Sequence, residues 1–138
     1  MKSGFVAIIG RPNTGKSTLI NSLIKWKTSI VTPKAQTTRF PVKAILNDEN
    51  SQIIIIDTPG ILNEEKYLLH KKMNEHIRNV IKEDADVIVL LVDATRDEDI
   101  PEEFVDLIKA HPSVIVVFNK IDKLGENRGI IKLLENKY

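Results

Sequence analysis

The sequence has no cysteine and few aromatic residues, and the lack of cysteine excludes the class of small disulfide-stabilised proteins. Without cysteine there is no disulfide framework, and aromatic residues make up only 5% of the 138 residues. The start MKSGFVAIIG is no signal peptide, and no apolar run approaches the length that crosses a bilayer. These absences predict a cytoplasmic protein without a transmembrane segment.

Acidic residues are missing from the first third of the chain. Residues 1–47 contain eight Lys or Arg and no Asp or Glu, although the net charge of the whole chain is only +1. A hydrophobic content of 42% in 138 residues is enough to bury one core and hardly two. We therefore expect a single domain over residues 1–138, with its positive charge concentrated in the first third.

A glycine-bounded segment at residues 10–17 reads GRPNTGKS and fits the pattern G-x-x-x-x-G-K-[ST]. It follows the strand-like FVAIIG and opens the helix-like STLINSLI, which is the context that a phosphate-binding loop requires. Glycine lets the backbone wrap closely with its N–H groups pointing inward, and the positive end of the helix dipole adds to this nest. The segment predicts a nucleotide-phosphate site.

Two side chains in this loop have predicted roles of their own. Lys16 is expected to reach the β- and γ-phosphates as a point charge and is a predicted catalytic residue. The Ser17 hydroxyl is expected to take one position on a Mg²⁺ ion, which prefers oxygen ligands. The residues predicted to surround the phosphates are Gly10, Arg11, Pro12, Asn13, Thr14, Gly15, Lys16, Ser17 and Thr18.

The tetrapeptide DTPG at residues 57–60 follows the apolar run SQIIII. Asp57 therefore leaves the sheet at the carboxyl end of its strand, where open α/β sheets bind ligands, and it is expected to hold Mg²⁺ through water. Pro59 and Gly60 are expected to turn the chain across the phosphates, and Thr58 is also predicted to bind the nucleotide. The N–H of Gly60 is expected to bond the γ-phosphate and to be released on hydrolysis, which is a predicted catalytic role. Alone the tetrapeptide is an ordinary turn, and only the upstream loop makes it a switch.

The segment NKID at residues 119–122 follows another apolar run, SVIVVF. An ionised Asp122 only accepts hydrogen bonds, so it suits the N1–H and exocyclic amine of guanine and repels the N1 acceptor of adenine. Lys120 can lay its stem along the base, and Asn119 can tie this loop to the phosphate-binding loop. The sequence thus predicts GTP and GDP as ligands, and it disfavours an ATP-using kinase or ATPase.

Apolar runs alternate with helical patterns along the chain, which predicts an α/β fold of the P-loop NTPase type. Runs that are apolar on both faces indicate a mostly parallel sheet covered by helices on two sides, with one antiparallel edge strand formed by a turn at residues 48–51. The expected strands are 4–9, 41–47, 52–57, 87–93 and 113–118, and the expected helices are 16–25, 64–82, 102–110 and 127–135.

With these motifs in place, the chain closely resembles the translation-factor-related GTPases and, within them, the bacterial Era family. The matching segments are GRPNTGKSTLIN, KAQTTR, DTPG and NKID, of which KAQTTR separates Era from its relatives. The resemblance implies slow, Mg²⁺-dependent hydrolysis of GTP to GDP. It also implies a first switch at residues 27–40 in which Thr38 binds Mg²⁺ and the γ-phosphate and acts in catalysis. The adjacent Thr37 is the alternative metal ligand.

Two positions depart from small GTPases such as Ras. Ile61 directly follows DTPG, where those proteins carry a Gln that orients the attacking water, so slow hydrolysis is expected. Asn13 stands in the phosphate-binding loop, where relatives with this residue use it to bind K⁺ in place of an arginine finger. The resemblance thus makes Asn13 a candidate catalytic residue and K⁺ a candidate cofactor. The alternative is that Asn13 only braces the loop by bonding nearby backbone.

The Era pattern continues beyond NKxD into a further strand, a loop over the guanine, a last helix and a KH domain. Only sixteen residues follow Asp122 here, so we expect an incomplete domain whose strand at 113–118 forms an uncovered edge prone to self-association. For the full-length family the resemblance implies action in small ribosomal subunit assembly and binding of its rRNA through the KH domain. The alternative function is a truncated nucleotide-binding core with weak or no GTPase activity.

The basic side chains of the first third have two readings. Lys25, Lys27, Lys34, Arg39 and Lys43 either contact RNA directly or form a solvated face that balances the charge of bound GTP.

Overall fold

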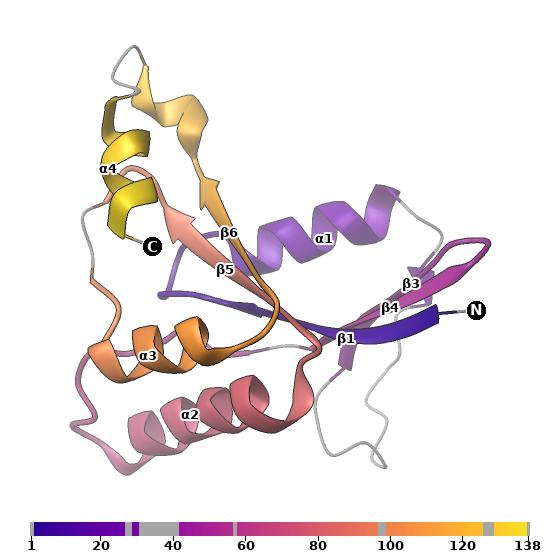
Figure 1. Cartoon of the computed structure of the whole chain (residues 1–138), viewed down its shortest axis with the longest axis horizontal. Helices are drawn as coiled ribbons and strands as arrows, with labels where there is room; N and C mark the ends of the chain where they lie inside the picture. Colours follow the sequence, from indigo (N-terminus) through magenta and orange to yellow (C-terminus); the bar gives the residue numbers. More distant parts are fainter. Residues whose placement is uncertain are drawn as a thin grey trace.

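Apolar side chains alternate between the two faces of β1 (Lys2–Ile9), and this alternation organises the fold. Ala7 and Ile9 belong to one buried cluster and Ile8 belongs to another, because successive side chains of a strand point to opposite faces of the sheet. Helices cover both faces as a result (Figure 1).

The computed structural model describes residues 2–26, 29–30, 42–56, 58–96, 99–125 and 129–137. After β1 the strands are β2 (Ser29–Ile30), β3 (Val42–Asn47), β4 (Ser51–Ile56), β5 (Val87–Asp93) and β6 (Val114–Asn119). The α-helices are α1 (Lys16–Trp26), α2 (Leu68–Asn79), α3 (Glu102–Ala110) and α4 (Gly129–Lys137). A π-helical turn, η1 (Val80–Asp84), extends α2, and a 3-10 turn, η2 (Ile121–Leu124), follows β6.

The described strands form one six-stranded sheet in the order β2-β3-β4-β1-β5-β6. β4, β1, β5 and β6 run parallel, whereas β3 is antiparallel to both β4 and β2. The parallel register places Asp93 opposite Asn119 at the carboxyl ends of β5 and β6. The loops after β1, β5 and β6 therefore emerge side by side at one edge of the sheet, as open α/β sheets require for ligand binding.

Two apolar clusters fill the space between the sheet and its helices. The larger lies beneath α2 and α3 and includes the fully buried Phe104, whose burial contributes about 1.5–3 kcal/mol. The smaller lies between the sheet and α1, around Ile20. In Figure 1, α2 and α3 lie on one side of the sheet and α1 on the other. Within the described residues, no helix is both long and apolar enough to span a lipid bilayer.

The predicted α/β architecture is confirmed, with two corrections. The strand predicted as the antiparallel edge is β3, but the two-residue β2 pairs with its outer side, so β3 is not the edge of the sheet. The single helix predicted over 64–82 is wrong at both ends, since α2 begins at Leu68 and passes into η1 at Val80. Its first predicted turn is held in an irregular path by side chains of α2, described below.

Candidate functional site

The loop between β1 and α1 folds around its own side chains. Thr14 is buried and its hydroxyl donates to the Arg11 carbonyl at 3.0 Å. The Lys16 ammonium donates to the carbonyls of Arg11 at 2.7 Å and Gly10 at 3.3 Å. The Lys16 cation therefore lies inside the concave loop at the N-terminus of an 11-residue helix, where an anion is favoured.

Gly15 is the point where this loop meets the segment after β6. Its φ of +100° lies in the region that favours glycine, and a Cβ atom there would collide with Nδ2 of Asn119. The same Nδ2 donates a hydrogen bond to the Thr14 carbonyl at 2.8 Å. The predicted tie between Asn119 and the phosphate-binding loop is thus confirmed, and it requires glycine at position 15.

Lys120 makes a second bridge between the two segments. Its ammonium donates to the Asn13 carbonyl at 2.6 Å and to the Asp93 carboxylate at 2.7 Å. Its side chain is anchored at both partners, which holds its methylene stem along the surface where a base is expected. Asp122 lies in η2, and its side chain is exposed and therefore accessible to a ligand.

Asp93 is a site residue that the sequence reasoning missed. It is 5% exposed at the end of β5, and its second oxygen accepts hydrogen bonds from the Thr95 N–H at 2.9 Å and hydroxyl at 2.6 Å. Burial raises the pKa of this carboxyl, but the hydrogen bonds from Lys120 and Thr95 outweigh burial and leave the pKa below its ordinary value. Its position at the carboxyl end of a parallel strand, which was used to single out Asp57, was a signal available in the sequence.

The DTPG segment packs directly on the phosphate-binding loop. The Thr58 hydroxyl is anchored on the Ile8 carbonyl at 2.6 Å, and the Ile61 N–H bonds the Gly10 carbonyl at 2.9 Å. A Cβ atom on Gly60 would lie 2.7 Å from the Pro12 nitrogen, so only glycine permits this contact. The N–H of Gly60 is therefore held beside the loop that is predicted to carry the phosphates.

Ile61 is fully buried in the cluster beneath α2. The side chain after DTPG thus points into the core, away from the predicted γ-phosphate position. This placement agrees with the expectation that Ile61 does not orient the attacking water.

Arg11 was predicted among the phosphate-binding residues, but its guanidinium lies on the DTPG side of the loop. Nη1 donates to the Ile61 carbonyl at 3.5 Å and to the side-chain oxygen of Asn63. The residue contributes its backbone carbonyl to the loop, and its side chain joins the loop to the segment that follows DTPG.

The predicted metal set is described only in part. The Ser17 hydroxyl is exposed at the start of α1, next to Lys16, and its oxygen chemistry fits Mg²⁺. Thr37, Thr38, Asp57 and the first switch at 27–40 lie outside the described residues, apart from the short β2. Among the described residues, no group of three His, Asp or Glu side chains forms a metal site of its own.

Asn13 has φ of +62° and an exposed side chain. Its carbonyl accepts the Lys120 hydrogen bond, whereas no hydrogen bond from its amide is found within the described part of the chain. Whether this amide binds K⁺ or braces the loop stays a prediction.

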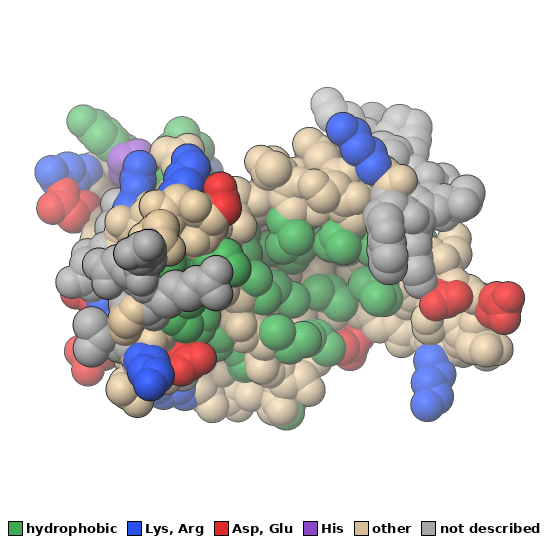
Figure 2. Space-filling model, turned by 90° about the horizontal axis from the view of Figure 1, so that it is seen from above, with side chains coloured by type: hydrophobic (Ala, Val, Ile, Leu, Met, Phe, Trp, Pro, Cys, Tyr) green, Lys and Arg blue, Asp and Glu red, His purple; other side chains and the backbone are tan. Residues whose placement is uncertain are grey.

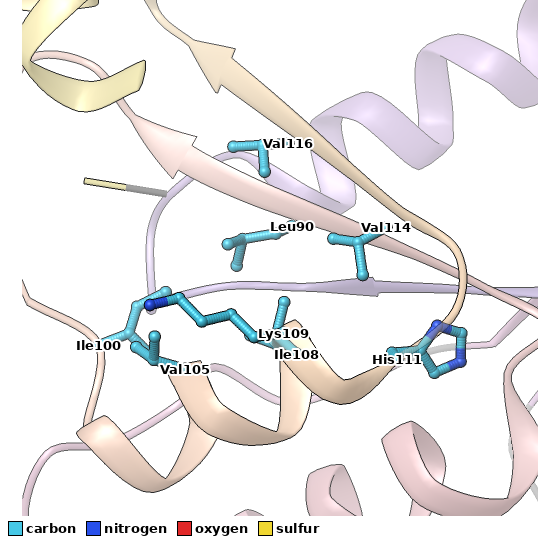
Figure 3. Close-up of a pocket in the computed structure, with 8 residues that line it drawn as sticks. All are labelled: Leu90, Ile100, Val105, Ile108, Lys109, His111, Val114 and Val116. Carbon is cyan, nitrogen blue, oxygen red and sulfur yellow. The ribbon is translucent and has the colours of Figure 1, made fainter. Parts of the chain in front are cut away.

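A cavity of about 230 Å³ lies away from these loops, between α3 and the strands β5 and β6 (Figure 3). Its lining is mostly aliphatic, and the Lys109 side chain extends along its rim. None of the phosphate-loop, DTPG or NKID residues lines it. The predicted nucleotide-binding residues therefore lie at the strand ends, outside this cavity.

Comparison with known proteins agrees with this site. A family model described as a 50S ribosome-binding GTPase matches residues 5–120. The GTPase Era of Aquifex aeolicus (strain VF5) is 45% identical over 142 residues, which cover 98% of this chain and 46% of that protein. The chain therefore spans about half the length of that relative.

Two solved structures of Era show the same fold. A crystal structure of an Aquifex aeolicus Era variant bound to GDP and AlF₄⁻ superposes with a TM-score of 0.74 at 43% identity, covering 99% of this chain and 46% of that one. An Era structure in complex with MgGDPNP and nucleotides 1506–1542 of 16S ribosomal RNA gives a TM-score of 0.74 at 44% identity, with the same coverage. The resemblance to Era that the motifs indicated is confirmed over this part of the relatives.

Proposed function

Because this chain belongs to the family of 50S ribosome-binding GTPases, we propose that it is a GTP- and GDP-binding switch that hydrolyses GTP slowly. The observation that carries the proposal is the joining of three motifs at one edge of the sheet. Asn119 and Lys120 are bonded to the loop that holds Lys16, and Gly60 packs on the same loop. One nucleotide can therefore contact all three segments at once.

In the proposed complex, residues 10–18 surround the phosphates and residues 119–122 select the base. Lys16 exchanges the carbonyls of Gly10 and Arg11 for phosphate oxygens. The carboxylate of Asp122 accepts from guanine, which gives GTP and GDP an advantage over ATP. An Era relative was crystallised with MgGDPNP, a GTP analogue, which supports the choice of nucleotide.

Hydrolysis would proceed by in-line attack of water on the γ-phosphorus. Lys16 would neutralise charge on the phosphates. Gly60 packs against Pro12, and its N–H would donate a hydrogen bond to the γ-phosphate. Ile61 supplies no polar group, so slow intrinsic turnover follows. Ser17, Thr38 and Asp57 would hold Mg²⁺, which would neutralise phosphate charge when bound. Thr37 is the alternative to Thr38.

Asn13 carries the proposal that K⁺ stimulates hydrolysis. Its amide is exposed beside the phosphate-binding loop and makes no hydrogen bond within the described residues, so its oxygen is available to a cation. A monovalent cation there would add positive charge where an arginine finger acts in other GTPases.

We extend the proposal to the cellular setting from the relatives alone. An Era structure contains a segment of 16S ribosomal RNA, which supports a role of the full-length protein in small ribosomal subunit assembly, in the cytoplasm. The resemblance to Era implies that the KH domain of the full-length protein makes this RNA contact. For the basic residues of the first third, such as Lys25, two roles stay open: direct contact with RNA, or balance of the negative charge of the nucleotide.

The exposed sheet face supports self-association. Within the described part of the chain, β6 ends the sheet and no strand pairs with its outer side. Beside it runs an apolar groove of about 470 Å³ over the sheet and α1, and Figure 2 shows hydrophobic side chains continuous across this side of the molecule. Ile115 of β6, 54% exposed, lies in this groove. A second copy of the chain could pair with this edge.

The experiment that tests the main proposal is titration of a fluorescent GDP analogue with Mg²⁺, with GTP, GDP and ATP as competitors. Competition by GTP and GDP but not by ATP would support the guanine switch. Equal competition by ATP would contradict the base selectivity assigned to Asp122. Binding without turnover in a subsequent phosphate-release assay would favour the alternative, a nucleotide-binding core without GTPase activity.

A further inference from the structure

Asn74 lies on α2 with 1% of its surface exposed, and its amide is paired with the backbone of a single residue. Oδ1 accepts from the Leu62 N–H at 3.1 Å, and Nδ2 donates to the Leu62 carbonyl at 2.9 Å. Nδ2 also donates to the Glu65 carboxylate at 3.2 Å. A buried amide with these partners is costly to displace, so Asn74 fixes the position of Leu62.

The Glu65 carboxylate is itself held in place. Arg78, one turn further along α2, bonds it at 2.6 Å and bonds Glu103 of α3 at 2.5 Å. The hydrogen bond from Arg78 lowers the pKa of Glu65, so the carboxylate stays ionised at neutral pH. The segment 62–65 is therefore attached to α2 at both of its ends.

The residues just before Leu62 are attached to the phosphate-binding loop. The Ile61 N–H bonds the Gly10 carbonyl at 2.9 Å, and Gly60 touches Pro12. Residues 60–62 thus form a three-residue connection between the loop on one side and Asn74 on the other. A shift of Leu62 must move Gly60 or stretch this connection.

This connection bears on hydrolysis because the side chain directly after DTPG cannot orient a water molecule. Ile61 is buried in the core, so alignment with a γ-phosphate depends on the backbone N–H of Gly60. The required precision of such donors is a few tenths of an ångström. A device that fixes the adjacent backbone is then needed, and Asn74 is the buried polar side chain that provides it.

We propose that Asn74 is a positioning residue for GTP hydrolysis, which holds the peptide of Leu62 so that the N–H of Gly60 stays aimed at the γ-phosphate. The inference rests on the GTPase activity proposed above. Asn74 touches neither nucleotide nor metal in this arrangement and acts through Leu62 and Gly60. A merely structural role would change stability without distinguishing GTP from GDP.

The test compares Asn74→Leu, which removes all three hydrogen bonds but keeps the branching of the side chain, with Ile108→Val as a control. Ile108 is a buried residue of α3, and its aliphatic side chain has no polar atom that could bond residues 60–62. Affinities for GDP and GDPNP and the single-turnover rate at saturating GTP are measured for each. Thermal midpoints measured in parallel allow comparison at equal loss of stability.

We expect Asn74→Leu to lower the single-turnover rate and the GDPNP affinity each by about tenfold, because one charge-assisted hydrogen bond is misplaced. The GDP affinity should change by less than about threefold, since GDP has no γ-phosphate for Gly60 to bond. The control should leave all three values near those of the wild-type chain. Equal losses for GDP and GDPNP, or unchanged rates despite a lower midpoint, would overturn the proposal.

Two further measurements keep this test separate from that of the GTPase activity. If Asn74→Leu does not fold, Asn74→Asp replaces it, because the carboxylate retains the acceptor for Leu62 but loses both donors. If the wild-type chain binds nucleotide without turnover, the ratio of GDPNP to GDP affinity still reports on Gly60. If the wild-type chain binds no nucleotide, hydrogen exchange of the backbone amides of residues 60–63 is measured instead. Exchange as slow in Asn74→Leu as in Ile108→Val would refute the proposal that Asn74 holds Leu62 in place.

Discussion

The Lys120 ammonium donates a hydrogen bond to the Asn13 carbonyl at 2.6 Å, and both residues have φ of +62°. Left-handed backbone in residues other than glycine costs about 1–3 kcal/mol each and persists where surrounding structure enforces it. Here the two conformations occur on the two loops that the proposed nucleotide must contact. The bond between them keeps the base side and the phosphate side of the site in register before a ligand arrives.

This relationship gives a clean test of the potassium proposal through Asn13→Gly. Glycine adopts φ of +62° readily and retains the carbonyl that Lys120 needs, so only the side-chain amide is removed. We expect GDP affinity to stay within about threefold of wild type and K⁺ stimulation of hydrolysis, relative to Na⁺, to be lost. Hydrolysis rates in the two salts measure this. Stimulation that persists in Asn13→Gly would exclude the amide as a K⁺ ligand.

Gly15→Ala should disrupt the site through a steric collision with Asn119. The added Cβ would meet Nδ2, which also bonds the Thr14 carbonyl, so the phosphate-binding loop and the base-binding segment must separate. We expect GDP affinity to fall at least about tenfold, corresponding to about 1.4 kcal/mol.

Gly125→Ala is the matched control for that substitution. Gly125 also has positive φ, at +58°, but nothing lies within 4 Å of an added Cβ. Both variants carry a backbone penalty, and only Gly15→Ala adds the collision. Titration with the fluorescent GDP analogue compares them. Equal losses of affinity would mean that backbone strain, and not contact with Asn119, is responsible.

Asp93→Asn should lower the free energy of unfolding, by an amount that depends on pH. The folded pKa of Asp93 lies below its ordinary value of 3.8, so its ionised form contributes stability in full above that value and loses the contribution as pH falls through the folded pKa. We expect the variant to be about 1–3 kcal/mol less stable than wild type at pH 7, since charged hydrogen bonds to Lys120 and Thr95 are lost.

Urea unfolding at a series of pH values measures this difference. The gap between wild type and Asp93→Asn should narrow as pH falls below about 4, because the carboxyl of the unfolded wild-type chain then binds a proton while the folded one, with its lower pKa, stays ionised. GDP affinity at pH 7 should fall with the stability, because Lys120 loses one of its two anchors. A gap that stays constant down to pH 3 would contradict the assigned pairing.

These variants also mark how far the sequence alone could predict the site. The three motifs were identified because each is contiguous and follows an apolar run that ends at the same edge of a parallel sheet. The tie from Asn119 to the phosphate-binding loop was predicted for the same reason and is confirmed at 2.8 Å.

Asp93 and Asn74 were not predicted. The strand-end position of Asp93 was a signal in the sequence, but the partners of both residues lie far from them in the chain. Asn74 bonds Leu62 twelve residues away, and Lys120 bonds Asp93 across 27 residues. Such pairs depend on how elements pack and not on local pattern. The same contacts explain why the helix predicted from residue 64 begins at Leu68: Asn74 and Arg78 hold residues 62–65 in a path that an α-helix does not follow.

Asp122→Asn should change which base the site accepts. The carboxylate accepts from both N1–H and the exocyclic amine of guanine, whereas an amide offers one acceptor and one donor. We expect GDP affinity to fall by about a hundredfold and affinity for xanthosine diphosphate, whose base O2 accepts from the amide, to rise. Asp106→Asn, which removes the same charge from an exposed position of α3, is the control. Unchanged preference for GDP in Asp122→Asn would contradict the assigned role.

Ile115→Lys tests association through the edge of the sheet. Ile115 is 54% exposed on β6 and lies in the apolar groove, so a lysine there places charge where a second copy would pack. Ile121→Lys is a close control, because Ile121 is also 54% exposed but lies in η2, outside the groove. Sedimentation velocity over a range of protein concentrations should show association for wild type and Ile121→Lys and a monomer for Ile115→Lys. A wild-type chain that stays monomeric throughout would show that exposed apolar surface at β6 is insufficient for pairing, and association of all three proteins alike would assign it to another face.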